Sequence, residues 1–174
     1  MKKILVILSI AVILFTVISA CEKDDICPPG SGTTPLLVVG FYDIQDQETE
    51  KSVVRLRVVG EGQDDPVNTF TDRSSVSEIS LPLKSFENST TFAVISDSAD
   101  DDNGVETGNI DSIRFDYNVQ EKYISRGCGY SVTYTLQEVT LNPGGSDDDE
   151  WIVSYELPVR DITPLDTIHV KIYH

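Results

Sequence analysis

Apolar and polar residues alternate along much of the chain, with the two-residue period of half-buried β-strands. Within residues 53–59 the pattern puts Val54, Leu56 and Val58 on one face, with arginines between them. Residues 34–43 are apolar at both parities, which predicts a strand covered on both faces. Further strands are expected between turns rich in Gly, Pro and acidic residues, at residues 67–70 (a short edge strand), 76–83, 90–96, 113–119, 130–136, 151–157 and 168–172.

No segment after residue 33 has a convincing helical period, so we expect an all-β domain over residues 34–174. Seven to nine short strands predict a single antiparallel β-sandwich, in an immunoglobulin-like or other Greek-key order. A small barrel is the alternative. The last strand, residues 168–172, is expected to be tied into a sheet.

Parity also predicts which side chains face the core. Cys128 shares its parity with Tyr134 and Leu136, so its thiol should point at the core if the alternation continues through Gly129. The other expected inward faces are Ile113, Phe115, Tyr117 and Val119; Tyr130 and Val132; Trp151, Val153, Tyr155 and Leu157; and Ile168, Val170 and Ile172.

The N-terminus has the organisation of an export signal. Lys2 and Lys3 precede an uncharged apolar run, and the small residues Ser19 and Ala20 precede Cys21. The order Ile-Ser-Ala-Cys resembles a bacterial lipobox, which implies cleavage before Cys21 and lipid on its thiol. Residues 1–20 are then a signal peptide and residues 21–33 a lipidated tether and linker. The alternative is an uncleaved signal anchor, for which the apolar run is slightly short.

Lys23, Asp24 and Asp25 follow the expected lipid attachment site directly. This order of charges resembles the surface-export signal of Bacteroidota lipoproteins, which implies the outer membrane and an outward-facing domain. A tether that is merely soluble is the alternative. The net charge of −16 disfavours nucleic-acid binding, because contacts with phosphates need clustered Lys and Arg.

Three cysteines are present, and one is assigned to lipid. The remaining pair, Cys27 and Cys128, would be exposed to an oxidising compartment, so we expect a disulfide between them. A metal-binding pair or a reactive thiol is the alternative. The two histidines, His169 and His174, neighbour neither cysteine.

The most acidic loop, residues 97–104, resembles a calcium-binding loop only loosely. Counting back from Gly104 places Ala99 at the first EF-hand position, and the expected bidentate Glu falls on Ile110. A looser calcium site stays open, while a solvated loop is favoured. Its ligands would be Asp100, Asp101, Asp102 and Asn103.

Four stretches, CEKDDIC, TPLLVVGFYD, SRGCGY and HVKIYH, resemble a flavobacterial lipoprotein family catalogued only as a domain of unknown function. The resemblance implies no activity. No paired nucleophile and base, G-x-S-x-G elbow or metal cluster is visible, and no cofactor is expected. We therefore expect a non-catalytic module that binds a glycan or a protein. A structural component of an envelope assembly is the alternative, and an uncharacterised hydrolase is the second.

Three Asp-Ser or Asp-Thr pairs resemble the Bacteroidota O-glycosylation motif. The acceptors would be Ser98, Ser112 and Thr167. Parity puts Ser112 and Thr167 opposite the inward residues, and Ser98 lies in the acidic loop, so all three are expected to face solvent. Ordinary turn chemistry explains the same pairs equally well.

Overall fold

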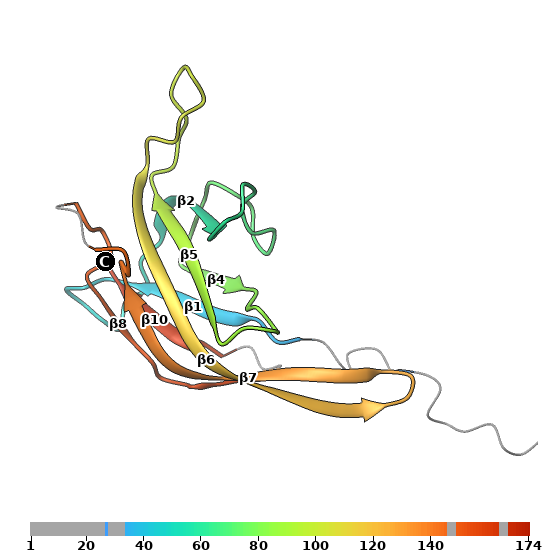
Figure 1. Ribbon diagram of the computed structural model, residues 1–174. Coiled ribbons are helices and arrows are strands. Elements are labelled where there is room, and N and C mark those ends of the chain that lie inside the picture. Colours follow the sequence, from blue (N-terminus) through green and yellow to red (C-terminus); the bar gives the residue numbers. More distant parts are fainter. Residues whose placement is uncertain (1–26, 28–33, 146–148, 164–166) are drawn as a thin grey trace, which may run out of the picture.

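The computed structural model describes residues 27, 34–145, 149–163 and 167–174, and these residues form a two-layer β-sandwich without helices (Figure 1). The predicted all-β fold is confirmed. The described residues contain ten strands, and β6 and β7 are far longer than predicted. The strands are β1 (Leu37–Tyr42), β2 (Val53–Gly60), β3 (Ser74–Val76), β4 (Glu78–Leu81), β5 (Ser89–Ser96), β6 (Asn109–Ser125), β7 (Gly129–Leu141), β8 (Ser154–Glu156), β9 (Asp161–Ile162) and β10 (Val170–Tyr173).

One sheet has the order β4-β1-β10-β8 and the other the order β3-β2-β5-β6-β7-β9. All pairs are antiparallel except β1 with β10, which run parallel with Val39 opposite Val170. The first and last strands therefore lie side by side in the middle of one sheet. This placement confirms that the C-terminal strand is tied into a sheet.

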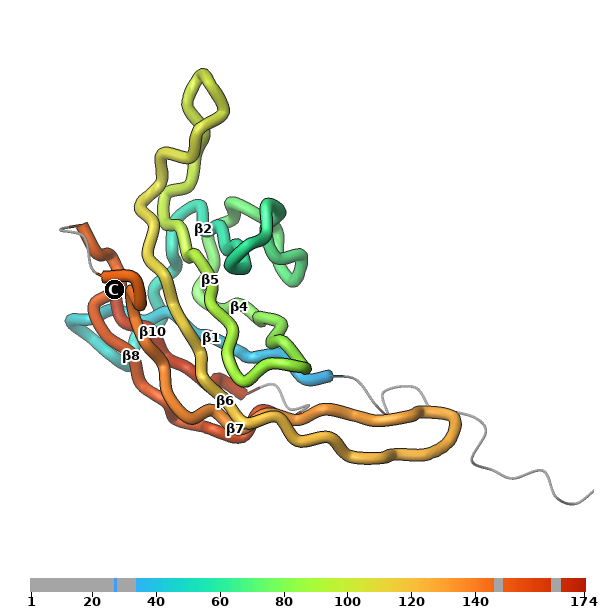
Figure 2. Tube along the Cα trace, viewed as in Figure 1, coloured from blue at the N-terminus to red at the C-terminus, as the bar shows by residue number. Residues whose placement is uncertain are grey.

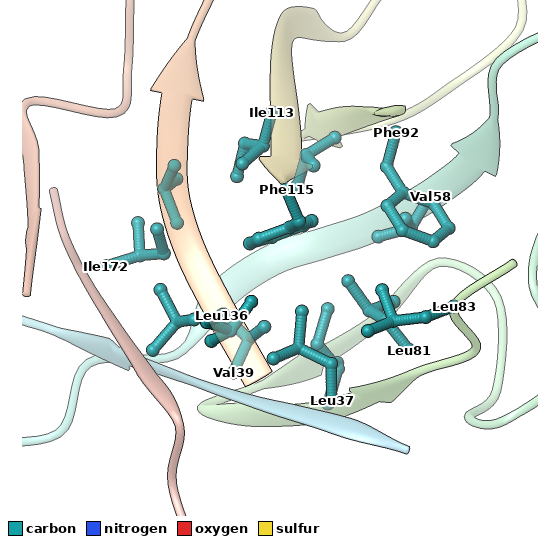
Figure 3. Close-up of a cluster of buried hydrophobic side chains, with 14 of the residues drawn as sticks. Leu37, Val39, Val58, Leu81, Leu83, Phe92, Ile113, Phe115, Leu136 and Ile172 are labelled. Atoms are coloured by element: carbon teal, nitrogen blue, oxygen red, sulfur yellow. The ribbon is translucent and has the colours of Figure 1, made fainter. Parts of the chain in front are cut away.

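The core lies between the two sheets, where aliphatic and aromatic side chains from both meet (Figure 3). Leu37 and Val39 of β1 lie on one side, and Phe115 and Leu136 of the larger sheet lie on the other. These side chains are almost fully buried. Truncating a buried Phe to Ala costs about 3–5 kcal/mol, so Phe115 alone contributes a large part of a typical domain's stability.

The outer face of β1 is also covered, as its apolar pattern predicts. Tyr42 and Tyr173 pack with their ring centroids 6.2 Å apart, and the Lys171 ammonium lies 4.7 Å from the centre of the Tyr42 ring. His169 is buried beside them and accepts a hydrogen bond at Nδ1 from the Val38 amide. Burial lowers the pKa of His169, so the imidazole stays neutral and able to accept this bond.

Strand β2 departs from the predicted alternation because it contains a bulge. The register with β3 shifts between Val53 and Leu56, and Arg55 has a positive φ of 46°. Val53 is consequently buried, and Val54, expected to face the core, is 56% exposed. The prediction for Val54 was wrong because a bulge adds one residue and reverses the parity before it.

Three other predicted strands differ from the structure. Residues 67–70 form no strand; only the adjacent Pro66 makes an isolated bridge, with Val59. Residues 76–83 divide between β3 and β4, which belong to different sheets. In residues 151–157, Ile152 is buried while Val153 and Tyr155 are exposed, the reverse of the prediction. Only the part within β8 is a strand, so a two-residue period does not hold before it.

The β6–β7 hairpin extends well beyond the sandwich, as the ribbon and tube views both show (Figures 1 and 2). Pairing of β6 with β5 ends at Asp116, and pairing of β7 with β9 starts at Tyr134. Within the described part of the chain, residues 118–133 therefore belong to a two-stranded ribbon flanked by no third strand. We call this segment the distal ribbon.

Candidate functional site

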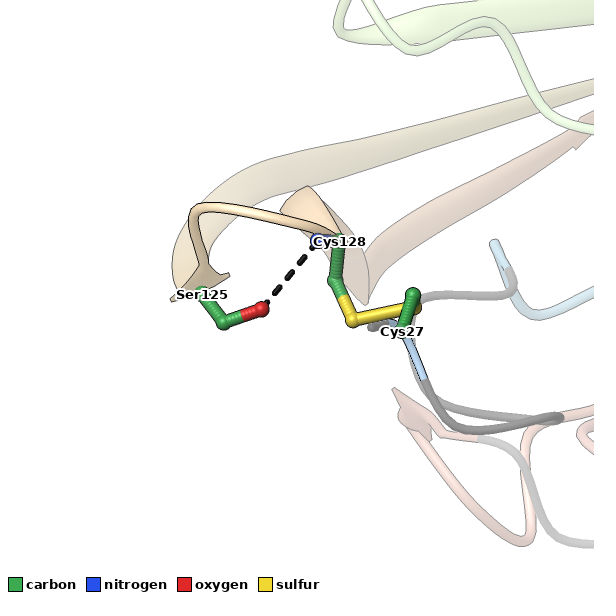
Figure 4. The surroundings of a disulfide bond; sticks show 3 residues. All are labelled: Cys27, Ser125 and Cys128. Atoms are coloured by element: carbon green, nitrogen blue, oxygen red, sulfur yellow. Dashed lines mark hydrogen bonds between the residues drawn. A yellow bond between two sulfur atoms is a disulfide. The ribbon is translucent and has the colours of Figure 1, made fainter. Parts of the chain in front are cut away.

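The predicted disulfide is present and joins Cys27 to Cys128, with a Cα–Cα distance of 4.8 Å (Figure 4). It links positions 101 residues apart. The predicted lipidation residue Cys21 and the predicted export residues Lys23, Asp24 and Asp25 lie outside the described residues.

Cys128 lies at the turn of the β6–β7 hairpin and not against the core. Its amide donates a hydrogen bond to the Ser125 hydroxyl across the turn (Figure 4). Gly129 has a φ of 70°, and the register shifts between Tyr123 and Ser125, so the alternation does not continue through Gly129. The core-facing prediction for Cys128 was wrong for this reason, and because the hairpin tip lies beyond the sandwich.

The distal ribbon presents a cross-strand pair of tyrosines. Tyr123 lies opposite Tyr130, and their rings meet edge to face with centroids 5.4 Å apart. They are 53% and 65% exposed, and Ile124 beside them is also exposed. Tyr130 was predicted to face the core. Parity sets the face of a strand that a residue occupies, but here nothing in the described chain covers that face.

Buried tyrosines fix the root of the same hairpin to the sandwich. The Tyr117 hydroxyl donates to the Lys84 carbonyl and bonds with the Thr90 hydroxyl. Tyr134 packs edge to face against Tyr117, with ring centroids 5.3 Å apart, and its hydroxyl bonds with that of Ser85. Satisfied hydroxyls of this kind hold two large rings in one orientation. The direction of the ribbon is therefore set by the body of the domain.

A hollow of about 530 Å³ opens beside β5, and it is lined by parts of residues 60–68, 82–84 and 90–92. Its apolar lining residues include Val67 and the exposed Pro82, and residues with amide, carboxylate and hydroxyl groups lie around it. We call it the β5 hollow. A mainly apolar concavity with a few polar groups is the usual form of a small-ligand site.

The β5–β6 loop folds back as a short hairpin, residues 97–108, which we call the acidic hairpin. The backbones of Asp100 and Glu106 form an isolated antiparallel β-bridge, and the Arg73 guanidinium donates hydrogen bonds to both carboxylates. Although burial raises the pKa of Glu106, hydrogen bonds from Ser98, the Gly108 and Ala99 amides and Arg73 together lower it to about 2. The hairpin is thus ordered by its own carboxylates.

Ser98 was predicted to be the most accessible glycosylation site, and that prediction was wrong. The side chain is 1% exposed, and its hydroxyl donates to Glu106 and accepts from Arg73. Ser112 is half-buried and Thr167 is exposed. Glycosylation of Ser112 and Thr167 stays a prediction.

The four residues of the possible calcium site do not form one site in this structure. Asp100 is engaged with Arg73, and Asp101 accepts hydrogen bonds from the Asn103 and Val105 amides, which lower its pKa. Asp102 is exposed. Among the described residues, no three His, Cys, Asp or Glu side chains come together in a way that could hold a metal ion.

The role of Asp111 could not be predicted from the sequence pattern. This carboxylate is buried and accepts hydrogen bonds from the Trp151 and Ile152 amides at 3.0 and 2.7 Å. Asn142 donates to its other oxygen. Burial raises the pKa of Asp111, although these hydrogen bonds oppose the rise. Asp111 therefore accepts the backbone hydrogen bonds that a neighbouring strand would otherwise accept from the segment that leads into β8.

Residues 55–174 match the model of a family of unknown function (DUF6452). The chain belongs to this family. The match covers β3 to β10 and most of β2, including the whole β6–β7 hairpin and Cys128, and confirms the expected membership of a family without an assigned activity. No curated protein and no solved structure matches the chain. Within the described residues, no helix is long and apolar enough to cross a membrane.

Proposed function

We propose that this member of the DUF6452 family is a lipid-anchored binding module at the outer surface of an outer membrane, and that it binds a neutral glycan in the β5 hollow. The lining of the hollow is the observation that carries the glycan assignment. Sugars combine apolar C–H faces with hydroxyls that both donate and accept hydrogen bonds. A site for them needs both kinds of surface.

The hollow offers both. Val67 and Pro82 supply apolar surface, while Gln63 and Asn68 supply amides that can donate and accept at once. Phe86, two residues beyond the lining residue Lys84, is 95% exposed and available for stacking against a sugar ring. These groups suit recognition of a ligand, and the proposal assigns the hollow no catalytic step.

The charge of the protein supports a neutral ligand. The net charge is −16, and Glu61 and Asp65 line the hollow against a single cation, Lys84. A field of this sign repels polyanions such as acidic polysaccharides and nucleic acids. A neutral oligosaccharide meets no such repulsion.

Binding of neutral oligosaccharides by the full-length protein in detergent tests the glycan assignment. Replacing both Gln63 and Asn68 with Ala should weaken binding about tenfold or more, since each lost hydrogen bond is worth about 1 kcal/mol. The matched control replaces Asn118 and Gln120, an exposed pair of the same residue types on β6. Equal affinities of the two double variants would show that the β5 hollow is not the site.

The anchor has a separate test. We expect wild-type protein to incorporate labelled fatty acid and Cys21→Ala to incorporate none, because no thiol remains there for lipid. Protease added to intact cells should digest the wild-type domain, and replacing Lys23, Asp24 and Asp25 with Ala should protect it. Labelling of the Cys21→Ala protein would contradict the anchor, and resistance of the wild-type domain in intact but not lysed cells would contradict surface display.

A structural role in an envelope assembly is the second candidate, and the distal ribbon favours it, because no third strand of the described residues pairs with its edges. Unpaired strand edges present amide and carbonyl groups to which another chain can add a strand. Crosslinking in live cells separates the two candidates. A single protein crosslinked in stoichiometric yield through the ribbon would support the structural role.

A further inference from the structure

We infer that the distal ribbon lies against the membrane that carries the lipid anchor, with Tyr123 and Tyr130 at the level of the lipid headgroups. The inference rests on the proposed lipidation of Cys21 and adds a second, non-covalent contact with the bilayer. Three observations carry it: the length of the tether, the chemistry of the ribbon and the distribution of charge.

The disulfide ties the hairpin tip to the lipid by a short stretch of chain. Six residue steps separate Cys21 from Cys27, so the two can be at most about 21 Å apart. Cys128 lies 4.8 Å from Cys27, measured between Cα atoms. The tip therefore stays within about 26 Å of the lipid attachment point. Without the bridge, the route from Cys21 to the start of β1 at Leu37 would be 16 residues, with a reach of about 55 Å.

The side chains held near the lipid are those that favour a membrane interface. Tyrosine has an apolar ring and a polar hydroxyl, and it is enriched where the bilayer meets water. Tyr123 and Tyr130 present two such rings on one face of the ribbon.

The distribution of charge along the β6–β7 hairpin favours an orientation with the distal ribbon toward the membrane and the acidic hairpin away from it. The distal ribbon holds two cations, Lys122 and Arg126, and one acid, Glu121, in a protein of net charge −16. The acidic hairpin, in contrast, lies at the other end of β6 (Figure 1). Seventeen residues of strand separate the two ends, about 55 Å along the chain. With the tether residues Glu22, Lys23, Asp24 and Asp25 included, the ribbon end carries a net charge of 1 − 2 = −1, against −5 for the acidic hairpin. An anionic membrane surface would therefore repel the ribbon end far less than the acidic hairpin.

Added tryptophans and lipid-borne quenchers test the contact in the lipidated, full-length protein. The protein is incorporated into vesicles of phosphatidylethanolamine and phosphatidylglycerol with acyl chains brominated near the headgroup. Tyr130→Trp reports on the ribbon. Tyr155→Trp, an exposed tyrosine on β8, is the matched control, and wild type supplies the signal of Trp151.

We expect the tryptophan of the Tyr130→Trp protein to lose about half of its added emission and to shift to the blue, as interfacial side chains do. The tryptophan of the Tyr155→Trp protein should do neither. Adding Cys27→Ser to Tyr130→Trp should remove most of the quenching while the protein still floats with the vesicles. This result would show that the contact of the ribbon with the bilayer depends on the disulfide and not on the lipid anchor alone.

Two outcomes would overturn the inference, and they differ from a failure of the anchor. If the protein floats with the vesicles but the Tyr130→Trp protein is quenched no more than the control, the ribbon does not touch the bilayer. If quenching of the ribbon tryptophan appears only with an added oligosaccharide or protein, that partner is the occupant instead. If wild-type protein does not float with the vesicles, the result contradicts the proposed lipid anchor, on which the inference rests.

Discussion

Replacing Asp111 with Ala removes the carboxylate that holds the segment before β8 onto the larger sheet. One oxygen of Asp111 accepts hydrogen bonds from both the Trp151 and Ile152 amides, and the Ile152 bond is buried. Ala leaves these two donors without an acceptor. Ile152 belongs to the core, so the segment cannot move into water without exposing apolar surface.

The magnitude follows from the two orphaned amides. A hydrogen bond to a charged group contributes about 1.5–3 kcal/mol, and an unpaired buried donor costs about 1–3 kcal/mol. The raised pKa of Asp111 shows that its charge is itself unfavourably desolvated, and its removal returns part of this cost. The balance predicts a loss of about 2–4 kcal/mol in the free energy of unfolding. The corresponding fall in Tm is about 6–15 °C for a domain of this size.

Urea unfolding followed by circular dichroism measures the loss. Asp102→Ala is the matched control, because it removes the same charge from an exposed position and should change stability by about 0.5 kcal/mol or less. Asp111→Asn should fall between them. Its carbonyl oxygen can accept from both amides, but its NH₂ then faces the donor group of Asn142. The reasoning is refuted if Asp111→Ala is no less stable than Asp102→Ala.

Three further predictions concern the hairpins and the remaining hydroxyl. Cys128→Ser should speed amide exchange throughout the distal ribbon and leave β5 unchanged, because the tip loses its disulfide to Cys27; equal exchange rates in the variant and the wild type would contradict a stabilising role of the disulfide. The pKa of Glu106 is lowered to about 2, so its contribution to the acidic hairpin is complete above about pH 4.5 and is lost as the pH falls toward 2. NMR of the Gly108 amide should follow that loss, and a resonance unchanged down to pH 2 would oppose it. Intact-mass measurement of the native protein should show an O-linked glycan that is lost in Thr167→Ala, since Thr167 is exposed; a glycan mass fully retained in that variant would exclude the site.

The sequence predicted the sandwich because burial on two faces leaves a clear pattern. Residues 37–42 are apolar at both parities, and in the structure all six are buried. The disulfide was predictable because only one pair is left among the three cysteines once Cys21 is set aside as the expected lipidation site. These features depend on composition and period, which are properties of the sequence alone.

The errors share a different physical origin. The bulge in β2 places Arg55 in a left-handed conformation that Gly or Asn usually adopts, so its residue type gives no warning. Ser98 is buried by contacts with Arg73 and Glu106, which a local reading of the loop does not contain. Parity correctly placed Tyr130 on the same face of its strand as Tyr134 and Leu136. It could not show that the hairpin extends beyond the opposite sheet, so that no described residue covers this face at Tyr130.

The distal ribbon holds together without a core of its own, and the fixing of its two ends explains how. An isolated two-stranded hairpin is marginal in water. Here the Tyr117 and Tyr134 hydroxyls fix the root, and the Cys27–Cys128 bond fixes the tip. The sandwich core contains no cysteine among its described residues, so reduction should release the tip and leave the β5 hollow intact. Reduced protein should therefore keep its affinity for a glycan and lose the quenching of a tryptophan placed at Tyr130, and loss of both together would show that ribbon and hollow are one functional unit.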